Sequence, residues 1–266
     1  MLIFSEEHKD YLNAIRREKR IILFWRVILI FIFLLLWEFG AQYEIINTFL
    51  FSSPTRIVKT IILLFKREEL INNISITIAE VLISFIFATV IGIFIATIMW
   101  FKKRFAKIID PYITIINSLP KVALGPLIII WVGASINSIV FMAITISVFT
   151  TIINIYSGFI SVDNDYLVMI KSFGASKWQI YKKIIFPSNL ENIITTLKIN
   201  ISLSLIGVIM GELLVSKKGL GYLIMYGSQV FNLDLVISSI FILGFISYVM
   251  YLLVDRLLIY IQKKRY

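Results

Sequence analysis

The sequence has no cysteine and a single histidine, His8, among its 266 residues. Without cysteine it can form no disulfide, thiolate nucleophile or cysteine-ligated metal site, and one histidine is no basis for a histidine-built metal site or proton relay. The chain is also poor in charge, with 16% charged and 59% hydrophobic residues and a mean hydropathy of +0.91. A soluble domain of this length needs more polar surface to cover its core.

Charged residues are missing from three long segments, residues 81–100, 122–162 and 235–254. A helix of about 20 apolar residues crosses the hydrocarbon core of a bilayer. The segment 122–162 is too long for one helix, and its Gly133-Ala-Ser-Ile-Asn-Ser sequence is typical of a turn. We therefore predict an all-α polytopic membrane protein with about six transmembrane helices. The expected spans are 21–41, 78–100, 111–131, 138–160, 192–215 and 235–260.

Lysine and arginine are distributed unevenly between the two sides that these spans define. If residues 1–20 form a cytosolic N-terminal segment, most of the 26 basic residues fall on that same side. Because basic residues are enriched on the cytosolic side, we expect a plasma-membrane protein with both termini in the cytosol. The net charge of +10 then reflects topology, and no nucleic-acid-binding motif accompanies it.

A helix outside the spans is expected after Ser53-Pro54, with Ser as N-cap and Pro at the first helical position. Its apolar residues recur on one face: Ile57, Ile61, Leu64 and Phe65. The helix lies in the membrane interface or packs as an ordinary loop helix on the spans.

The longest internal loop on the predicted cytosolic side, residues 163–190, has the pattern of a folded segment. Ser176 and Gln179 form a capping box, Gly174 suits a helix end with positive φ, and Pro187 is expected to end the second helix. Two short helices joined at Gly174 would lie across the cytosolic mouth. Apolar side chains in the loop need a protein or membrane surface for burial: Leu167, Ile170, Phe173, Trp178 and Tyr181.

This loop resembles the characteristic loop of binding-protein-dependent ABC importer permeases of the type I class. The family pattern is Glu-Ala-Ala, three residues, Gly, nine residues, Ile, any residue, Leu-Pro. Gly174, Ile184 and Pro187 keep this spacing, Phe186 replaces the Leu, and Val168-Met169-Ile170 replaces Glu-Ala-Ala. Other segments resemble the nitrate, sulfonate, taurine and bicarbonate branch: Ser53-Pro54, Asp110-Pro111, Ser118-Leu-Pro-Lys121, Gly125-Pro-Leu-Ile-Ile-Ile-Trp131, and Gly211-Glu212 followed by Gly219-Leu-Gly221.

The resemblance implies a type I ABC importer permease fold, with a single transmembrane domain over residues 21–266 and its core at 70–256. It implies a homodimer, or a heterodimer with a close relative, that moves a small anionic or heterocyclic solute, delivered by an extracellular or periplasmic solute-binding protein. The loop would be a coupling helix seated in a cytosolic ABC ATPase dimer. ATP and Mg would be bound there, with no cofactor and no enzymatic activity in this chain, since it has no G-x-x-x-x-G-K-[ST] motif. The implied coupling residues are Leu167, Ile170, Gly174, Ser176, Trp178, Tyr181, Ile184 and Pro187.

Lys121 falls in the middle of the predicted span 111–131, where an unpaired ammonium costs at least about 2.5 kcal/mol. Three prolines interrupt the same segment: Pro111, Pro120 and Pro126. Irregular backbone at this depth is found inside protein or along a water-filled cavity. We therefore expect Ser118–Gly125 to face the translocation pathway. Alternatively, Lys121 pairs with an interior carboxylate such as Glu212 or reaches a wet surface.

Glu212 lies near the predicted outer end of the fifth span, where it gates the external mouth or is solvated at its rim. Glu38 and Glu80 are expected to snorkel or to be helix-terminal charges at outer helix ends. Gly207-x-x-x-Gly211 predicts close helix packing. The expected pathway residues are Ser118, Pro120, Lys121, Gly125 and Glu212.

An ion-gradient-driven secondary transporter is the alternative function. Such proteins usually have more spans, inverted repeats and several interior acids. A membrane-embedded enzyme would need a catalytic cluster, and the sequence has neither H-E-x-x-H nor G-x-S-x-G.

Overall fold

The computed structural model describes residues 6–263, and within that range it consists of helices and turns without a strand. Five helices are long and apolar enough to cross a membrane, and a bent pair of shorter helices would make a sixth. The prediction of an all-α polytopic membrane protein is therefore confirmed. The five helices are α1 (Glu6–Gln42), α4 (Glu69–Phe101), α7 (Ile136–Ile160), α11 (Leu190–Val215) and α13 (Leu233–Lys263).

Three of these helices, α7, α11 and α13, each begin two residues before the predicted span. The helix α4 begins nine residues earlier than expected, at Glu69. The N-terminal segment is not separate from the first span, because α1 runs without a break from Glu6 through its apolar part. Residues 1–5 of that segment lie outside the described range.

The predicted span 111–131 is not one straight helix, as the prolines that interrupt it indicated. It is divided between α5 (Lys103–Ser118) and the pair η1 (Lys121–Leu124) and α6 (Gly125–Val132), which meet at an angle of 88°. Leu119 is extended, with ψ 145°, because the ring of Pro120 disfavours helical backbone in the residue before it. Pro111, in contrast, lies inside α5 without breaking it.

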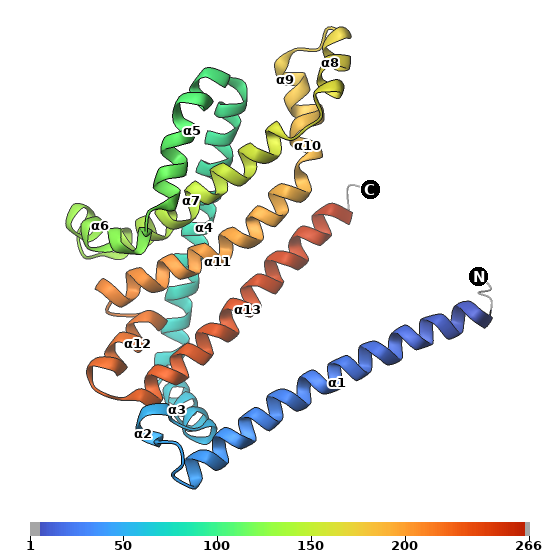
Figure 1. Cartoon of the computed structure of the whole chain (residues 1–266). Coiled ribbons are helices and arrows are strands. Elements are labelled where there is room, and N and C mark those ends of the chain that lie inside the picture. The colour runs from blue at the N-terminus through green and yellow to red at the C-terminus, as the bar shows by residue number, and fades with distance from the viewer. Residues whose placement is uncertain (1–5, 264–266) are drawn as a thin grey trace.

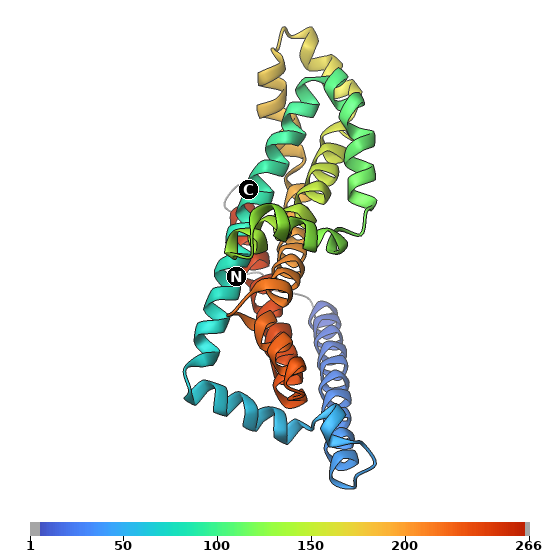
Figure 2. The same cartoon turned by 90° about the vertical axis from the view of Figure 1, so that its left-hand side faces the viewer.

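The two ends of the molecule are formed by short helices. At one end, α2 (Thr48–Phe51) and α3 (Pro54–Lys66) join α1 to α4; at the other, α8 (Asn164–Ser172) and α9 (Lys177–Ile180) project beyond the long helices (Figure 1). Figure 2 shows α3 running crosswise at its end of the molecule. As predicted, Ser53 caps α3, accepting a hydrogen bond from the Arg56 amide at 3.3 Å.

The helix α3 packs on the long helices with one face and leaves other apolar side chains exposed, which is compatible with both alternatives for it. Ile57 and Leu64 are buried, whereas Phe65 stays 59% exposed. Arg56 pairs with Asp234 of α13 at 2.7 Å, and the Thr55 amide donates to Glu38 of α1 at 2.9 Å. These bonds hold the start of α3 against two long helices.

The centre of the fold is α7, which packs between α4 and α11. Gly211 of α11 lies so close to α7 that a Cβ there would meet the Ile139 Cα at 2.9 Å, and Gly207 lies still closer to Ala143. The predicted Gly-x-x-x-Gly packing is thus confirmed. The helix α1 differs, because none of its apolar window is buried and it diverges from the other helices (Figure 1).

Candidate functional site

The loop between α7 and α11 is folded as the capping pattern predicts. Gly174 has φ +78°, and its amide donates to the Lys171 carbonyl at 2.9 Å, which ends α8. Ser176 then begins α9 with both bonds of a capping box: its amide donates to Gln179 Oε1 at 2.8 Å, and the Gln179 amide donates to Ser176 Oγ at 3.3 Å. The loop therefore has a defined shape.

Pro187 does not end a helix, and that expectation is wrong. The segment α9 continues into a π-helical turn, η2 (Tyr181–Ile185), then α10 (Phe186–Ser188), and α11 follows after Asn189. The wide π turn accommodates a proline ring that an α-helix interior would reject. The second half of the loop is consequently joined to α11 by almost unbroken helical backbone.

Tyr181 attaches this loop to the long helices. Its hydroxyl and Thr97 Oγ1 of α4 are 2.8 Å apart, and because Thr97 donates to the Ile93 carbonyl, Tyr181 is the donor. Burial raises the pKa of the Tyr181 phenol, so it keeps this proton. Its ring lies 5.2 Å from the Phe101 ring of α4 and 5.6 Å from the Phe159 ring of α7. The loop and the two helices form one packed unit.

The predicted coupling residues divide into an inner and an outer group. Trp178 forms the outer group and is 59% exposed. Phe173, which is not one of the predicted coupling residues, is 82% exposed on the same loop, so the tip presents aromatic surface. Gly174 and Ser176 shape the backbone between them. The remaining members lie partly or fully buried beneath the tip: Leu167, Ile170, Tyr181, Ile184 and Pro187.

At the bend after α5, Lys121 is half-buried and bound within the chain. Its Nζ donates to Asn117 Oδ1 at 2.7 Å and to the Ile146 carbonyl at 3.0 Å. The alternative that Lys121 pairs with Glu212 is wrong. Ser118 and Pro120 are exposed at the bend, while Gly125 is buried where a Cβ would meet Leu214 at 2.7 Å. Four of the five expected pathway residues are thus close together, and Glu212 is bonded elsewhere.

Glu212 is buried, with 1% exposed, so the expectation of a solvated rim carboxylate is wrong. It accepts hydrogen bonds from Thr77 Oγ1 of α4 at 2.7 Å and from the Gly221 amide of α12 (Leu220–Gln229) at 2.6 Å. Thr77 in turn accepts from the Leu220 amide at 2.9 Å, and Asn73 accepts from the Gly219 amide at 2.6 Å. Glu212 therefore connects the start of α12 to α4 and α11.

The glycines before α12 leave room for this carboxylate. A Cβ at Gly221 would lie 2.7 Å from the Glu212 Cβ and 2.9 Å from the Ile209 carbonyl oxygen. Gly219 has φ +105°, and a Cβ there would overlap the Glu212 carboxyl group. The Gly-Leu-Gly sequence is needed for this close approach.

Glu80 is 3% exposed and faces Glu212, so the expectation that it snorkels to water is wrong. Neither of its carboxyl oxygens receives a hydrogen bond from a donor group of the described chain. Glu38 does lie at a helix end, where it accepts bonds from Thr55 at 2.7 and 2.9 Å. Within the described residues, no group of three or more His, Cys, Asp or Glu could hold a metal ion.

Sequence reasoning missed the polar groups that complete both sites. Asn73, Thr77 and Glu80 recur at intervals of four and three residues, which places them on one face of the apolar helix α4. Asn117 precedes Lys121 by four residues. Polar residues spaced three or four positions apart in or beside an apolar segment are the sequence signal for such buried polar groups.

The five candidate spans and the bent pair define a multi-pass membrane protein. The model of one family, the binding-protein-dependent transport system inner membrane component, matches residues 88–265, more than half of the chain. The chain belongs to this family.

Similar proteins agree with this assignment. The chain is 29% identical to the formylaminopyrimidine transport permease protein ThiX of Halalkalibacterium halodurans, over 80% of this chain and 85% of that one. It is 30% identical to a putative ABC transporter permease of Methanocaldococcus jannaschii, over 74% and 72% of the two chains. It is also 24% identical to the putative aliphatic sulfonates transport permease SsuC of Bacillus subtilis, over 80% and 77%.

Solved structures show the same fold. The MetNI methionine ABC transporter in an inward-facing conformation matches with a TM-score of 0.61 at 17% identity, over 69% of this chain and 91% of that one. An amino acid ABC transporter matches with a TM-score of 0.57 at 18% identity, over 77% and 97%. The chain has the type I ABC importer permease fold and is a transport subunit, in line with relatives that are named as permeases and not as enzymes.

Proposed function

We propose that two copies of this chain form an ATP-driven pathway for a small anionic or heterocyclic solute in the plasma membrane, with all chain termini in the cytosol. An external solute-binding protein delivers the solute, and a cytosolic ABC ATPase dimer binds ATP and Mg and drives the cycle. The observation that carries this proposal is the exposed aromatic tip of Phe173 and Trp178 on a loop that Tyr181 attaches to α4 and α7.

A loop built in this way can transmit a movement of its partner. Packed cores and continuous helices move as rigid pieces and deform little. A displacement of the ATPase at Trp178 would pass through η2 and α10 into α11, and through Tyr181 into α4 and α7. These three helices form the centre of the fold, so their reorientation would open the pathway to one side or the other.

The bend at Ser118–Gly125 is the proposed solute-facing part of the pathway. It combines the exposed Ser118 and Pro120 with the half-buried ammonium of Lys121. A cation at this position favours an anionic or hydrogen-bond-accepting solute. Glu212 acts differently, since it holds α12 against α4 and is not accessible to a solute.

Transport in sealed vesicles tests the energy source. With the ATPase and the binding protein co-expressed, uptake should require ATP and survive collapse of ion gradients. Uptake that continues without the ATPase and stops when the gradients collapse would establish the alternative, a secondary transporter driven by an ion gradient.

Variants at the tip test the contact directly. Phe173→Ala and Trp178→Ala should lower co-purification of the ATPase with the tagged permease, because exposed aromatics dominate protein interfaces. Phe231→Ala is the matched control, since Phe231 is 73% exposed on the turn between α12 and α13. Equal ATPase retention in all of these variants would contradict the proposed docking site.

The solute is best sought with the binding protein. The relatives are named for formylaminopyrimidine, aliphatic sulfonates and riboflavin. A thermal-shift screen of the partner binding protein against these compounds, nitrate, taurine and bicarbonate would identify the class.

A further inference from the structure

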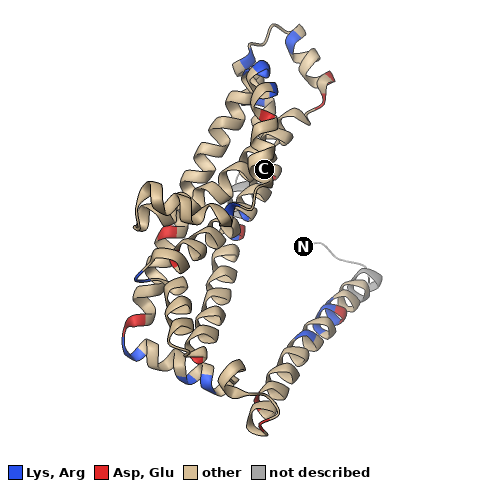
Figure 3. Ribbon diagram, turned by 60° about the vertical axis from the view of Figure 1, so that its left-hand side comes forward, with Lys and Arg blue, Asp and Glu red and all other residues tan. Residues whose placement is uncertain are grey.

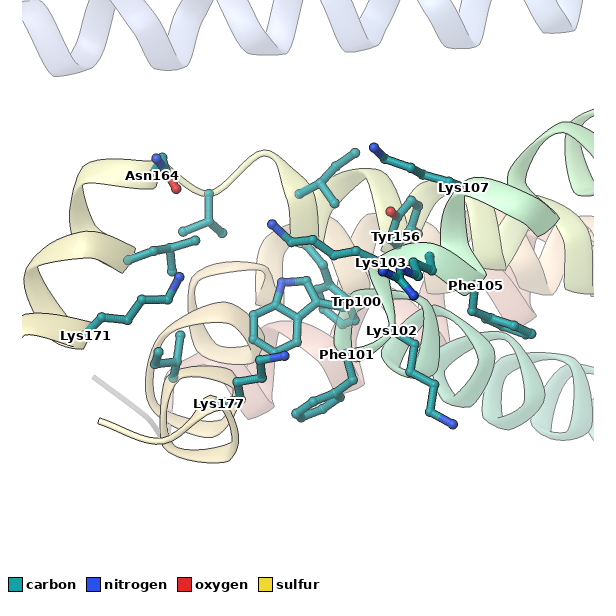
Figure 4. A pocket seen from close by; sticks show the side chains of 16 residues that line it. Trp100, Phe101, Lys102, Lys103, Phe105, Lys107, Tyr156, Asn164, Lys171 and Lys177 are labelled. Atoms are coloured by element: carbon teal, nitrogen blue, oxygen red, sulfur yellow. The ribbon is translucent and has the colours of Figure 1, made fainter. Parts of the chain in front are cut away.

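A cavity of about 840 Å³ opens at the end of the molecule that carries the α8–α9 loop. It lies between the turn from α4 to α5 and the loop, with the end of α7 as its third wall. Its size is that of a site for an organic ligand. Figure 4 shows lysine side chains distributed around Trp100 in this cavity.

The lining of the cavity carries charge of one sign. No Asp or Glu of residues 6–263 lines the cavity. Six of its lining residues are basic: Lys102, Lys103, Arg104, Lys107, Lys171 and Lys177. No ion pair joins any of the six to an acid within the described part of the chain. Asp110 acts electrostatically on Tyr156 but does not line the cavity. Like charges gathered in one concave site attract an anion strongly.

The floor of the same cavity is aromatic. Trp100 and Phe101 end α4, and Tyr156 and Phe159 end α7, where these helices leave their apolar segments. Tryptophan and tyrosine at such positions lie at the level of lipid headgroups. A small inorganic anion would use the basic residues and leave this floor without a partner.

An apolar stripe leads away from the cavity along α4. Phe87, Val90 and Phe94 are exposed, and their spacing places them on the same helix face as Phe101. A ligand with one anionic end and long apolar chains would contact the basic rim, the aromatic floor and the stripe together. This combination distinguishes a phospholipid from a soluble phosphate.

We propose that the cavity binds the phosphate headgroup of an anionic phospholipid from the membrane leaflet on the α8–α9 side. The headgroup bridges the basic residues at the start of α5 and those of the loop, Lys171 and Lys177, while an acyl chain lies along the α4 stripe. Because it neutralises charges on both sides of the cavity, the lipid holds the loop in a fixed position relative to α4 and α5. The assignment of this leaflet to the cytosol rests on the proposed function.

Lipid binding by the full-length permease alone tests the site, without its ATPase. The purified protein is placed in nanodiscs of phosphatidylcholine, with or without phosphatidylglycerol, and its thermal unfolding and lipid retention by native mass spectrometry are measured. The test variant replaces Lys103, Lys107, Lys171 and Lys177 by Gln. The control replaces Lys59, Lys66, Lys217 and Lys218 by Gln, which gives the same change in net charge at exposed positions elsewhere.

Phosphatidylglycerol should stabilise the wild type and the control, and the test variant should retain it at least about tenfold less well. If both variants lost phosphatidylglycerol retention equally, general surface charge would explain the effect, and the proposed lipid site would be overturned. If inorganic phosphate stabilised the protein equally in nanodiscs of phosphatidylcholine alone, the cavity would be a site for a soluble anion and the proposal of a lipid ligand would be overturned. Failure of the ATPase to bind the permease would contradict the proposed function while leaving this result intact.

Discussion

Glu80 and Glu212 are two carboxyl groups buried against each other, and their surroundings differ. Glu212 accepts bonds from Thr77 and Gly221, which favour its ionised form, whereas Glu80 receives none. Two neighbouring buried carboxylates repel each other unless one is protonated. Because Glu212 accepts these bonds and Glu80 accepts none from the described residues, we expect Glu80 to be the protonated member of the pair.

Amide substitutions at these two positions should have unequal effects. In Glu80→Gln a neutral amide replaces a neutral carboxyl group of similar shape, so we expect a change in unfolding free energy within about 1 kcal/mol. In Glu212→Gln the amide group would face the Thr77 hydroxyl or the Gly221 N–H, losing a charge-assisted bond of about 1.5–3 kcal/mol. Thermal unfolding in detergent measures both.

Infrared difference spectroscopy gives an independent measurement of the same proton. The carbonyl stretch of a protonated carboxyl group should be present in the wild type and absent in Glu80→Gln. Equal destabilisation by the two amide variants, or a protonated-carboxyl band that persists in Glu80→Gln, would contradict the assignment of the proton to Glu80.

Lys121→Met tests the role of the bend. The substitution keeps an unbranched side chain, one atom shorter, and removes its charge, while Asn117 keeps its bond from Thr150 at 3.1 Å. We expect solute uptake to fall several-fold with assembly and basal ATPase activity nearly unchanged, since the ammonium makes no ion pair that the fold needs. Lys66→Met on the exposed side of α3 serves as control. Uptake at the wild-type level would remove Lys121 from the pathway.

At the scale of the element, Gly174 determines how α8 and α9 are joined. No atom lies within 4 Å of the position of its Cβ, so a side chain there meets no obstacle and only the positive φ matters. A β-branched residue in left-handed backbone costs roughly 1–2 kcal/mol or more. Gly174→Val should therefore redirect α9 and the Trp178 side chain, while the apolar helices still insert.

The expected phenotype is a permease that is present in the membrane but retains less ATPase and transports less solute. Gly174→Asn is the matched control, because asparagine tolerates positive φ, and it should stay close to wild type. Co-purification of the ATPase, measured beside uptake, separates the two variants. Normal values of both in Gly174→Val would contradict the coupling role of the loop.

Helices were predicted best where a local pattern decides them. The caps at Ser53 and Ser176 involve residues three positions apart, so the sequence alone contains them. The bend at Pro120 and the passage through Pro187 are opposite outcomes for the same residue type. Pro120 ends the helix at Leu119, whereas a π-helical turn before Pro187 lets the helical backbone continue. The packing of Tyr181 against α4 and α7 stabilises that turn.

At the scale of the whole molecule, the positions of the basic residues and of the exposed apolar side chains both fit a protein that spans a membrane. Figure 3 shows basic residues gathered at the end that carries the α8–α9 loop. The helix α1 contacts the body chiefly through the stacked rings of Trp37 and Phe241, 6.0 Å apart, and through Glu38 and Thr55. On α6, Ile130 and Trp131 are 76% and 73% exposed. One chain leaves much apolar surface for lipid or a second copy.

We expect native mass spectrometry of the solubilised transporter to show two permease copies with two ATPase subunits. The reason is geometric, since a chain with five or six spans does not enclose a pathway that opens alternately to each side. In the proposed complex, each copy would also contribute one α8–α9 loop to one ATPase. A complex with a single permease copy would contradict the homodimer.

The sequence by itself determined the membrane character, most of the long helices and the folded loop, because these depend on composition, helical period and caps within a few residues. It also determined the family, through motifs whose order and spacing it preserves. Only the tertiary structure decided the partners of the buried polar groups. Glu212 meets Thr77, 135 positions away, and Lys121 meets the Ile146 carbonyl, and neither pairing has a local signal. A charge inside an apolar helix demands a partner, but the packing of α4, α7, α11 and α12 selects which one.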